Sequence, residues 1–152
     1  MTARIRPITV DFLLFFLTAF IKPFEFSGKY SSAGQADGYI YAIASEGSTG
    51  NVHYMMYPDP VDLTAFSKLN AYAYLKQNSS MGRGGLYVWS GANKQTVVAS
   101  VGLSVSWNTA SIDVSKLQGE YYIGFSGAPT YSSAWGNSYG GSVYAKNLWL
   151  EP

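Results

Sequence analysis

Apolar and polar residues alternate along most of the chain after residue 38, and this two-residue period predicts β-strands with one buried face. The longest alternation covers residues 68–77, where one predicted face is apolar: Leu69, Ala71, Ala73 and Leu75. The other face of the same stretch is polar or aromatic: Lys68, Asn70, Tyr72, Tyr74 and Lys76. Shorter strands are expected at residues 39–44, 52–57, 86–90, 96–105, 103–107, 111–115, 121–125 and 142–151.

Polar turns separate these strands about every ten residues, which gives roughly eight or nine short strands. This spacing predicts an all-β fold, an antiparallel β-sandwich of the jelly-roll type, rather than a parallel α/β sheet. Residues 39–44 and 52–57 are expected to pair as a hairpin. Asp62 should accept backbone N–H bonds from a short turn that places Leu63 and Phe66 inward and carries the chain from one sheet to the other.

The first 26 residues contain an uncharged apolar block, residues 12–21, between Asp11 and Lys22. Ten helical residues cover about 15 Å, half of a bilayer core, so a membrane-spanning helix is not expected. Three interpretations stay open: a cleaved secretion signal, a segment packed on its own domain, and a docking segment buried against another subunit.

We favour docking, because so apolar a stretch is poorly suited to exposure. We therefore predict an assembly segment at residues 1–26 and a sandwich domain at residues 27–152. The assembly residues would be Phe12, Leu13, Phe15, Phe16, Phe20, Phe24 and Phe26.

Composition limits the partners of the protein. The 152 residues suffice for one domain with its own core. Charged residues make up 12% and the net charge is +1, without a basic run, so the electrostatic field that nucleic acid requires is missing. The chain has no cysteine, which excludes disulfides and thiolate metal sites. No cofactor is expected, and the hydroxyl-rich composition suits neutral polar ligands or permanent assembly.

The sequence gives little indication of catalysis. His53 is the single histidine, which excludes a multi-histidine metal site. A glycan hydrolase would need two carboxylates across a cleft. The five candidates all fall where turns and loops need acceptors or follow turn glycines: Asp37, Asp59, Asp62, Asp113 and Glu120. We therefore predict no catalytic residue, although a small glycan hydrolase remains the least favoured alternative.

Residues 126–141 form a long connection built from Tyr, Trp, Ser, Gly and Asn. Aromatic rings offer a large contact area at low entropic cost, and Ser and Asn add adaptable hydrogen bonds. The predicted glycan-binding residues are Tyr131, Trp135, Asn137 and Tyr139. The alternative is an ordinary loop with Trp135 folded onto the rim of the sandwich. The remaining tryptophans fall within strand patterns and are expected in the core or an interface: Trp89, Trp107 and Trp149.

Several short motifs resemble those of β-sandwich modules in bacteriophage minor structural and tail-fibre proteins. They lie at residues 61–64 with 68–70, 86–90, 112–115, 119–124 and 147–151. They contain an Asp-Leu-Thr opening, an Asp-Val-Ser-Lys-Leu-Gln-Gly turn followed by Tyr-Tyr-Ile-Gly, and a final strand ending Leu-Glu. The resemblance covers about residues 38–151 and implies a jelly-roll fold, a virion location, homo-oligomerisation and glycan attachment.

The resulting expectation is a non-enzymatic virion protein of the tail, fibre or capsid. It would be attached to other virion proteins through residues 1–26, with a host-surface glycan as a further partner. The alternative is a secreted carbohydrate-binding module whose apolar N-terminal block is a cleaved signal.

Overall fold

The computed structural model describes residues 13–16, 25–27, 30–36, 39–44, 53–77, 83–91, 96–128, 130–132, 137–139 and 141–152. These ranges contain fourteen β-strands and no helix, so none of them provides a helix able to cross a membrane. The strands are β1 (Leu13–Phe16), β2 (Glu25–Ser27), β3 (Tyr30–Ala36), β4 (Tyr39–Ala44), β5 (His53–Met56), β6 (Val61–Asp62), β7 (Lys68–Gln77), β8 (Arg83–Trp89), β9 (Val97–Gly102), β10 (Asn108–Asp113), β11 (Glu120–Ala128), β12 (Thr130–Ser132), β13 (Asn137–Tyr139) and β14 (Gly141–Glu151).

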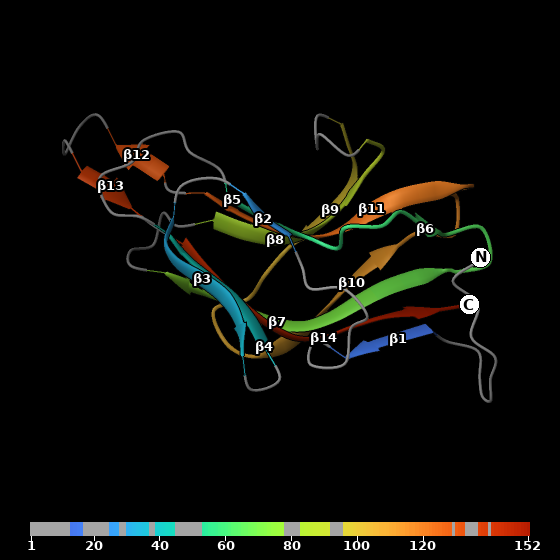
Figure 1. The fold of residues 1–152 in the computed structure, drawn as a ribbon, viewed down its shortest axis with the longest axis horizontal. Helices are drawn as coiled ribbons and strands as arrows, with labels where there is room; N and C mark the ends of the chain where they lie inside the picture. The colour runs from blue at the N-terminus through green and yellow to red at the C-terminus, as the bar shows by residue number, and fades with distance from the viewer. Residues whose placement is uncertain are drawn as a thin grey trace.

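Two antiparallel sheets form the domain. The first sheet has the order β10-β7-β14-β4-β3, with β1 also paired to β14, and the second has the order β2-β5-β11-β8-β9, with β6 also paired to β11. Figure 1 shows the two sheets stacked as layers, with the separate β12–β13 hairpin beyond one end of them. The predicted all-β, jelly-roll-like sandwich is confirmed.

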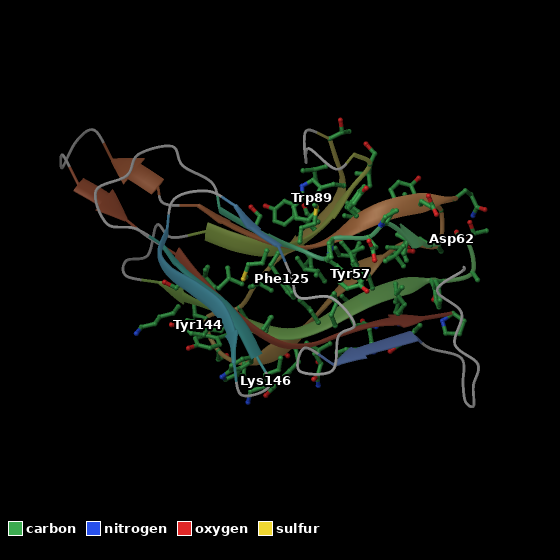
Figure 2. All side chains as sticks on the ribbon, in the orientation of Figure 1. Tyr57, Asp62, Trp89, Phe125, Tyr144 and Lys146 are labelled. Carbon is green, nitrogen blue, oxygen red and sulfur yellow. The ribbon has the colours of Figure 1, made fainter. Side chains whose placement is uncertain are left out.

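A continuous apolar core lies between the sheets, and Figure 2 shows Phe125 and Tyr57 projecting into this space. Strand β7 has the bounds predicted from its alternation, and its four apolar residues are all buried. Asn70 is the exception on the opposite face, because it is only 3% exposed although a solvent-facing position was expected. It is buried between its register partners, Ser111 on β10 and Trp149 on β14.

The turn after β6 is also as predicted. Thr64 N donates to Asp62 Oδ1 at 2.9 Å, Leu63 is fully buried, and the chain passes from β6, beside the second sheet, to β7 in the first. This turn is held against the turn that precedes β11. Leu63 N donates to Gly119 O and Gly119 N donates to Thr64 Oγ1, each at 2.9 Å.

The predicted hairpin between residues 39–44 and 52–57 is wrong. Strand β4 pairs with β3 and β14 in the first sheet, whereas β5 pairs with β2 and β11 in the second. The two strands therefore belong to opposite layers. An alternating pattern shows which face of a strand is buried but does not identify its hydrogen-bonding partner.

The predicted strand at residues 103–107 is wrong as well, because this segment is the crossing from β9 to β10. Leu103 N donates to Gly84 O in the second sheet, and Ser104 O accepts from Leu75 N in the first. Val105, which the alternation placed inward, is 65% exposed. The strand predicted at 96–105 accordingly ends at Gly102.

The backbone of the apolar N-terminal segment pairs with both sheets of its own domain. Strand β1 pairs with β14 from Leu13 opposite Leu150 to Phe16 opposite Asn147. Strand β2 pairs with β5 and crosses the predicted boundary at residue 26. Both pairings are those expected of a segment packed on its own domain. Docking to another subunit through residues 1–26 stays a prediction, and Phe12, Phe20 and Phe24 lie outside the described residues.

Gly119 has a φ of +93°, a backbone conformation in which other L-residues are strained. We expect Gly119→Ala to lower the free energy of unfolding by about 1–2 kcal/mol, because a side chain in this conformation is unfavourable. Gly102→Ala is the matched control, since an added Cβ there also meets no atom within 4 Å and its φ is not in the strained range. Urea denaturation of both variants measures the difference; equal effects would contradict the role of Gly119.

Hydrogen bonds from Thr64 and from Ser115 lower the pKa of Asp62 and of Asp113, respectively. A lowered folded-state pKa stabilises the fold at pH values above the unfolded-state pKa, and this contribution is lost as the pH falls through the folded-state value. We expect the Asp62→Asn, Asp113→Asn double variant to be less stable than the parent at neutral pH, because an amide oxygen is a weaker acceptor than a carboxylate. The difference should shrink below about pH 4. Thermal unfolding from neutral to acidic pH tests this, and parallel curves for the two proteins would refute it.

Candidate ligand-binding face

The outer face of the first sheet carries a cluster of aromatic side chains. Tyr74 on β7 and Tyr144 on β14 are register partners whose rings stack at 4.9 Å with an interplanar angle of 11°. Tyr72 lies two residues before Tyr74, on the same face of β7. All three side chains are partly exposed. Figure 2 shows Tyr144 and Lys146 on the side of the first sheet that faces away from the second.

Trp107 covers part of this face from the connection between β9 and β10. Its ring stacks on Tyr72 at 5.3 Å and meets Tyr74 at 4.7 Å in a tilted arrangement. Lys146 Nζ lies 4.6 Å from the centre of the same ring, a cation–π contact. We call Tyr72, Tyr74, Trp107, Tyr144 and Lys146 the aromatic face.

A β-bulge in β14 places Lys146 in this cluster. The register with β7 shifts between Ala145 and Asn147, so Lys146 is an additional residue in its strand. Before the bulge Val143 and Ala145 are buried, and after it Leu148 and Leu150 are buried. Bulges commonly redirect a side chain next to a functional site. Here the exposed Lys146 lies on the outer face beside Tyr144.

The outer face becomes polar toward the other end of the sheet. Ser111 Oγ donates to Asn70 Oδ1 at 2.5 Å, and the buried Asn70 Nδ2 has no hydrogen-bond partner in the described structure. Buried polar groups are normally paired, so this amide nitrogen is an exception among the described side chains. Trp149 Nε1 donates to Glu151 Oε1 at 3.0 Å. A surface pocket of about 430 Å³ lies at this end, lined by Ser67, Lys68, Ser111, Ile112, Asp113 and Ser115.

Two of the described carboxylates, Asp62 and Asp113, accept hydrogen bonds within turns. Asp113 Oδ1 accepts from the Ser115 backbone N–H at 2.9 Å and from its hydroxyl at 2.6 Å, as Asp62 accepts from Thr64. A general acid needs a raised pKa, whereas these hydrogen bonds lower the pKa of Asp62 and of Asp113. Among the described residues, no group of three or more His, Asp and Glu is arranged to hold a metal ion.

The glycan-binding residues predicted from residues 126–141 are separate from the aromatic face. Tyr131 lies on β12 and Asn137 and Tyr139 lie on β13, and these strands pair as a hairpin with Ser132 opposite Asn137. Trp135 lies outside the described residues. Their role in glycan binding stays a prediction. Trp89, expected in the core or an interface, is 1% exposed and stacks on Tyr87 in the second sheet.

The aromatic face was not predicted from the sequence as a site. The alternation places Tyr72 and Tyr74 on the outer side of their strand but indicates no role for them. One signal was available, because the buried apolar positions of the last strand change from odd numbers, Val143 and Ala145, to even numbers, Leu148 and Leu150. That change of parity indicates a bulge near Lys146.

No protein-family model matches the chain, and no curated protein matches it. Solved structures do match. Two are variants of a family 29 carbohydrate-binding module studied for ligand recognition: one has 16% identity and a TM-score of 0.57, with 93% of this chain and 92% of that chain covered. The other has 17% identity and a TM-score of 0.56, with coverages of 91% and 83%.

A third match is the glycoside hydrolase domain structure of Endo-D from Streptococcus pneumoniae, at 11% identity and a TM-score of 0.53. It covers 84% of this chain but only 21% of that one. At these identities the likeness shows the shared β-sandwich fold.

The contact between Lys146 and Trp107 is testable by a double-mutant cycle with Lys146→Met and Trp107→Leu. We expect a coupling energy of about 0.5–1 kcal/mol, the usual strength of an exposed cation–π contact. Urea denaturation of the parent, the two single variants and the double variant gives this value. A parallel cycle with the exposed Lys116, which lies in the turn after β10, should give no coupling. Additive effects of Lys146→Met and Trp107→Leu would contradict the contact.

Proposed function

We propose that this chain is a non-catalytic carbohydrate-binding domain that holds glycans on the aromatic face of its first sheet. The observation that carries the proposal is the set of partly exposed tyrosine rings held in fixed positions on adjacent strands. A sugar ring has an apolar C–H side and polar edges, so it suits a tyrosine that offers both a ring and a hydroxyl.

Pre-organisation supports this proposal. Tyr74 and Tyr144 lie on the paired strands β7 and β14. Their rings stack on each other, and the Tyr74 ring also contacts Trp107. Side chains that are already ordered lose less conformational entropy when a ligand binds. The β-sandwich structures of carbohydrate-binding modules that resemble this fold add further support.

The proposal follows the secreted alternative, in which the domain meets its glycan outside the cell. The virion role, with its homo-oligomer and virion partners, rests on the sequence resemblance and stays a prediction. Detection of the chain in purified phage particles would support it. In that setting the aromatic face would be an attachment surface for host glycans.

We expect Tyr74→Ala and Tyr144→Ala each to weaken glycan binding at least about tenfold, because aromatic anchors at the centre of a site dominate affinity. Affinity electrophoresis against soluble β-glucan, glucomannan and xylan identifies a ligand, and titration calorimetry measures the variants. Tyr122→Ala is the matched control, since Tyr122 is a partly exposed tyrosine in the second sheet.

Circular dichroism checks that all three variants are folded. Equal loss in Tyr122→Ala, or full affinity in both Tyr74→Ala and Tyr144→Ala, would refute the aromatic face as the site. No binding to any glycan would refute the function itself.

A further inference from the structure

Charged residues are few in the first sheet and unevenly placed. Strands β1, β3 and β4 contain none. The charged residues of β7, β10 and β14 are Lys68, Lys76, Asp113, Lys146 and Glu151. Asp113 and Glu151 are the two carboxylates in this set. Their position along the strands therefore decides the sign of the charge at each end of the face.

Both carboxylates flank the same lysine. Lys68 is the register partner of Asp113 on β10 and of Glu151 on β14. The pKa of Asp113 is lowered mainly by its hydrogen bonds to Ser115, and the charges of Lys116 and Lys68 add to this effect. The acidic residues of the sheet are thus gathered at the Lys68 end, beside the polar pocket.

The other two lysines lie at the aromatic end. Lys76 is two residues beyond Tyr74 on the same face of β7, and its register partner is the uncharged Ser142. Lys146 lies over Trp107 and remains exposed. Within the strands of the first sheet, no carboxylate is in register with either lysine.

A ligand lying on the tyrosines would therefore meet two ammonium groups and no carboxylate from the sheet itself. A hexuronic acid has the ring of a neutral sugar, with its apolar side, and carries a carboxylate in place of the hydroxymethyl group. Stacking on tyrosine and attraction to lysine can thus act on the same sugar residue.

We propose that the aromatic face selects anionic glycans containing uronic acids over neutral glycans of the same backbone, through Lys76 and Lys146. This inference rests on the proposed carbohydrate-binding function and adds the ligand class. Trp107 has a positioning role in it, because its ring holds the Lys146 ammonium above the face.

The test compares two oligosaccharides of six sugars, a β-1,4-linked glucuronan and the β-1,4-linked glucan with the same linkages. Calorimetry with the full chain should give at least about tenfold tighter binding of the glucuronan at low salt, where charges act over about 30 Å. The preference should nearly vanish at about 1 M salt, where screening reduces the distance over which charges act to about 3 Å. The Lys76→Gln, Lys146→Gln double variant should lose the preference at low salt, because its affinity for the glucuronan falls toward its affinity for the neutral glucan.

The control double variant Lys68→Gln, Lys116→Gln removes the same net charge away from the aromatic end and should keep the preference. Equal loss in both double variants would show an effect of net charge alone and overturn the inference. Tighter or equal binding of the neutral glucan would overturn the anionic preference while leaving the proposed function intact. Binding of neither oligosaccharide would count against both.

Discussion

The change of parity in β14 is the constraint on which both the core and the candidate site depend. The buried apolar residues are odd-numbered before Lys146, namely Val143 and Ala145, and even-numbered after Asn147, namely Leu148 and Leu150. A continuous alternation would bury Asn147 and Trp149 and would expose Leu148 and Leu150. The bulge avoids this cost, and its additional residue is the lysine that lies over Trp107. The same local irregularity therefore completes the core and adds a charge to the outer face.

A hydrogen-bonded junction at the start of β7 fixes the strand that carries Tyr72 and Tyr74. Ser67 N donates to Glu151 O, Ser67 O accepts from Val114 N, and Ser67 Oγ donates to the Pro152 carbonyl at 2.6 Å. One residue thus connects the ends of β10 and β14 to β7, which lies between them in the first sheet. This anchoring, together with the buried residues on the inner side of β7, holds in place the backbone that carries Tyr72 and Tyr74.

Local patterns predicted local structure well, and the limits of the prediction have a physical origin. The bounds of β7, the Asp62 and Asp113 turns and the inward Leu63 depend on side-chain periodicity and on short-range hydrogen bonds, which the sequence displays directly. The partners of β4 and β5, and the crossing at residues 103–107, depend on which layer each strand joins. That choice is made by contacts distant in sequence. The aromatic face could not be predicted for the same reason, since its members come from β7, β14 and the connection before β10.

Trp107 differs from the tyrosines of the aromatic face in how many neighbours its ring contacts. Its ring is already engaged by Tyr72, Tyr74 and the Lys146 ammonium. A ring with this many neighbours has less free surface for a sugar than Tyr144, whose ring stacks on Tyr74. The indole therefore organises the cluster, whereas under the proposed function the tyrosines and the lysines would contact the ligand. In a chain with 12% charged residues, Lys146 lies on an aromatic surface without a carboxylate in register, and the proposed selection of anionic glycans depends on this arrangement.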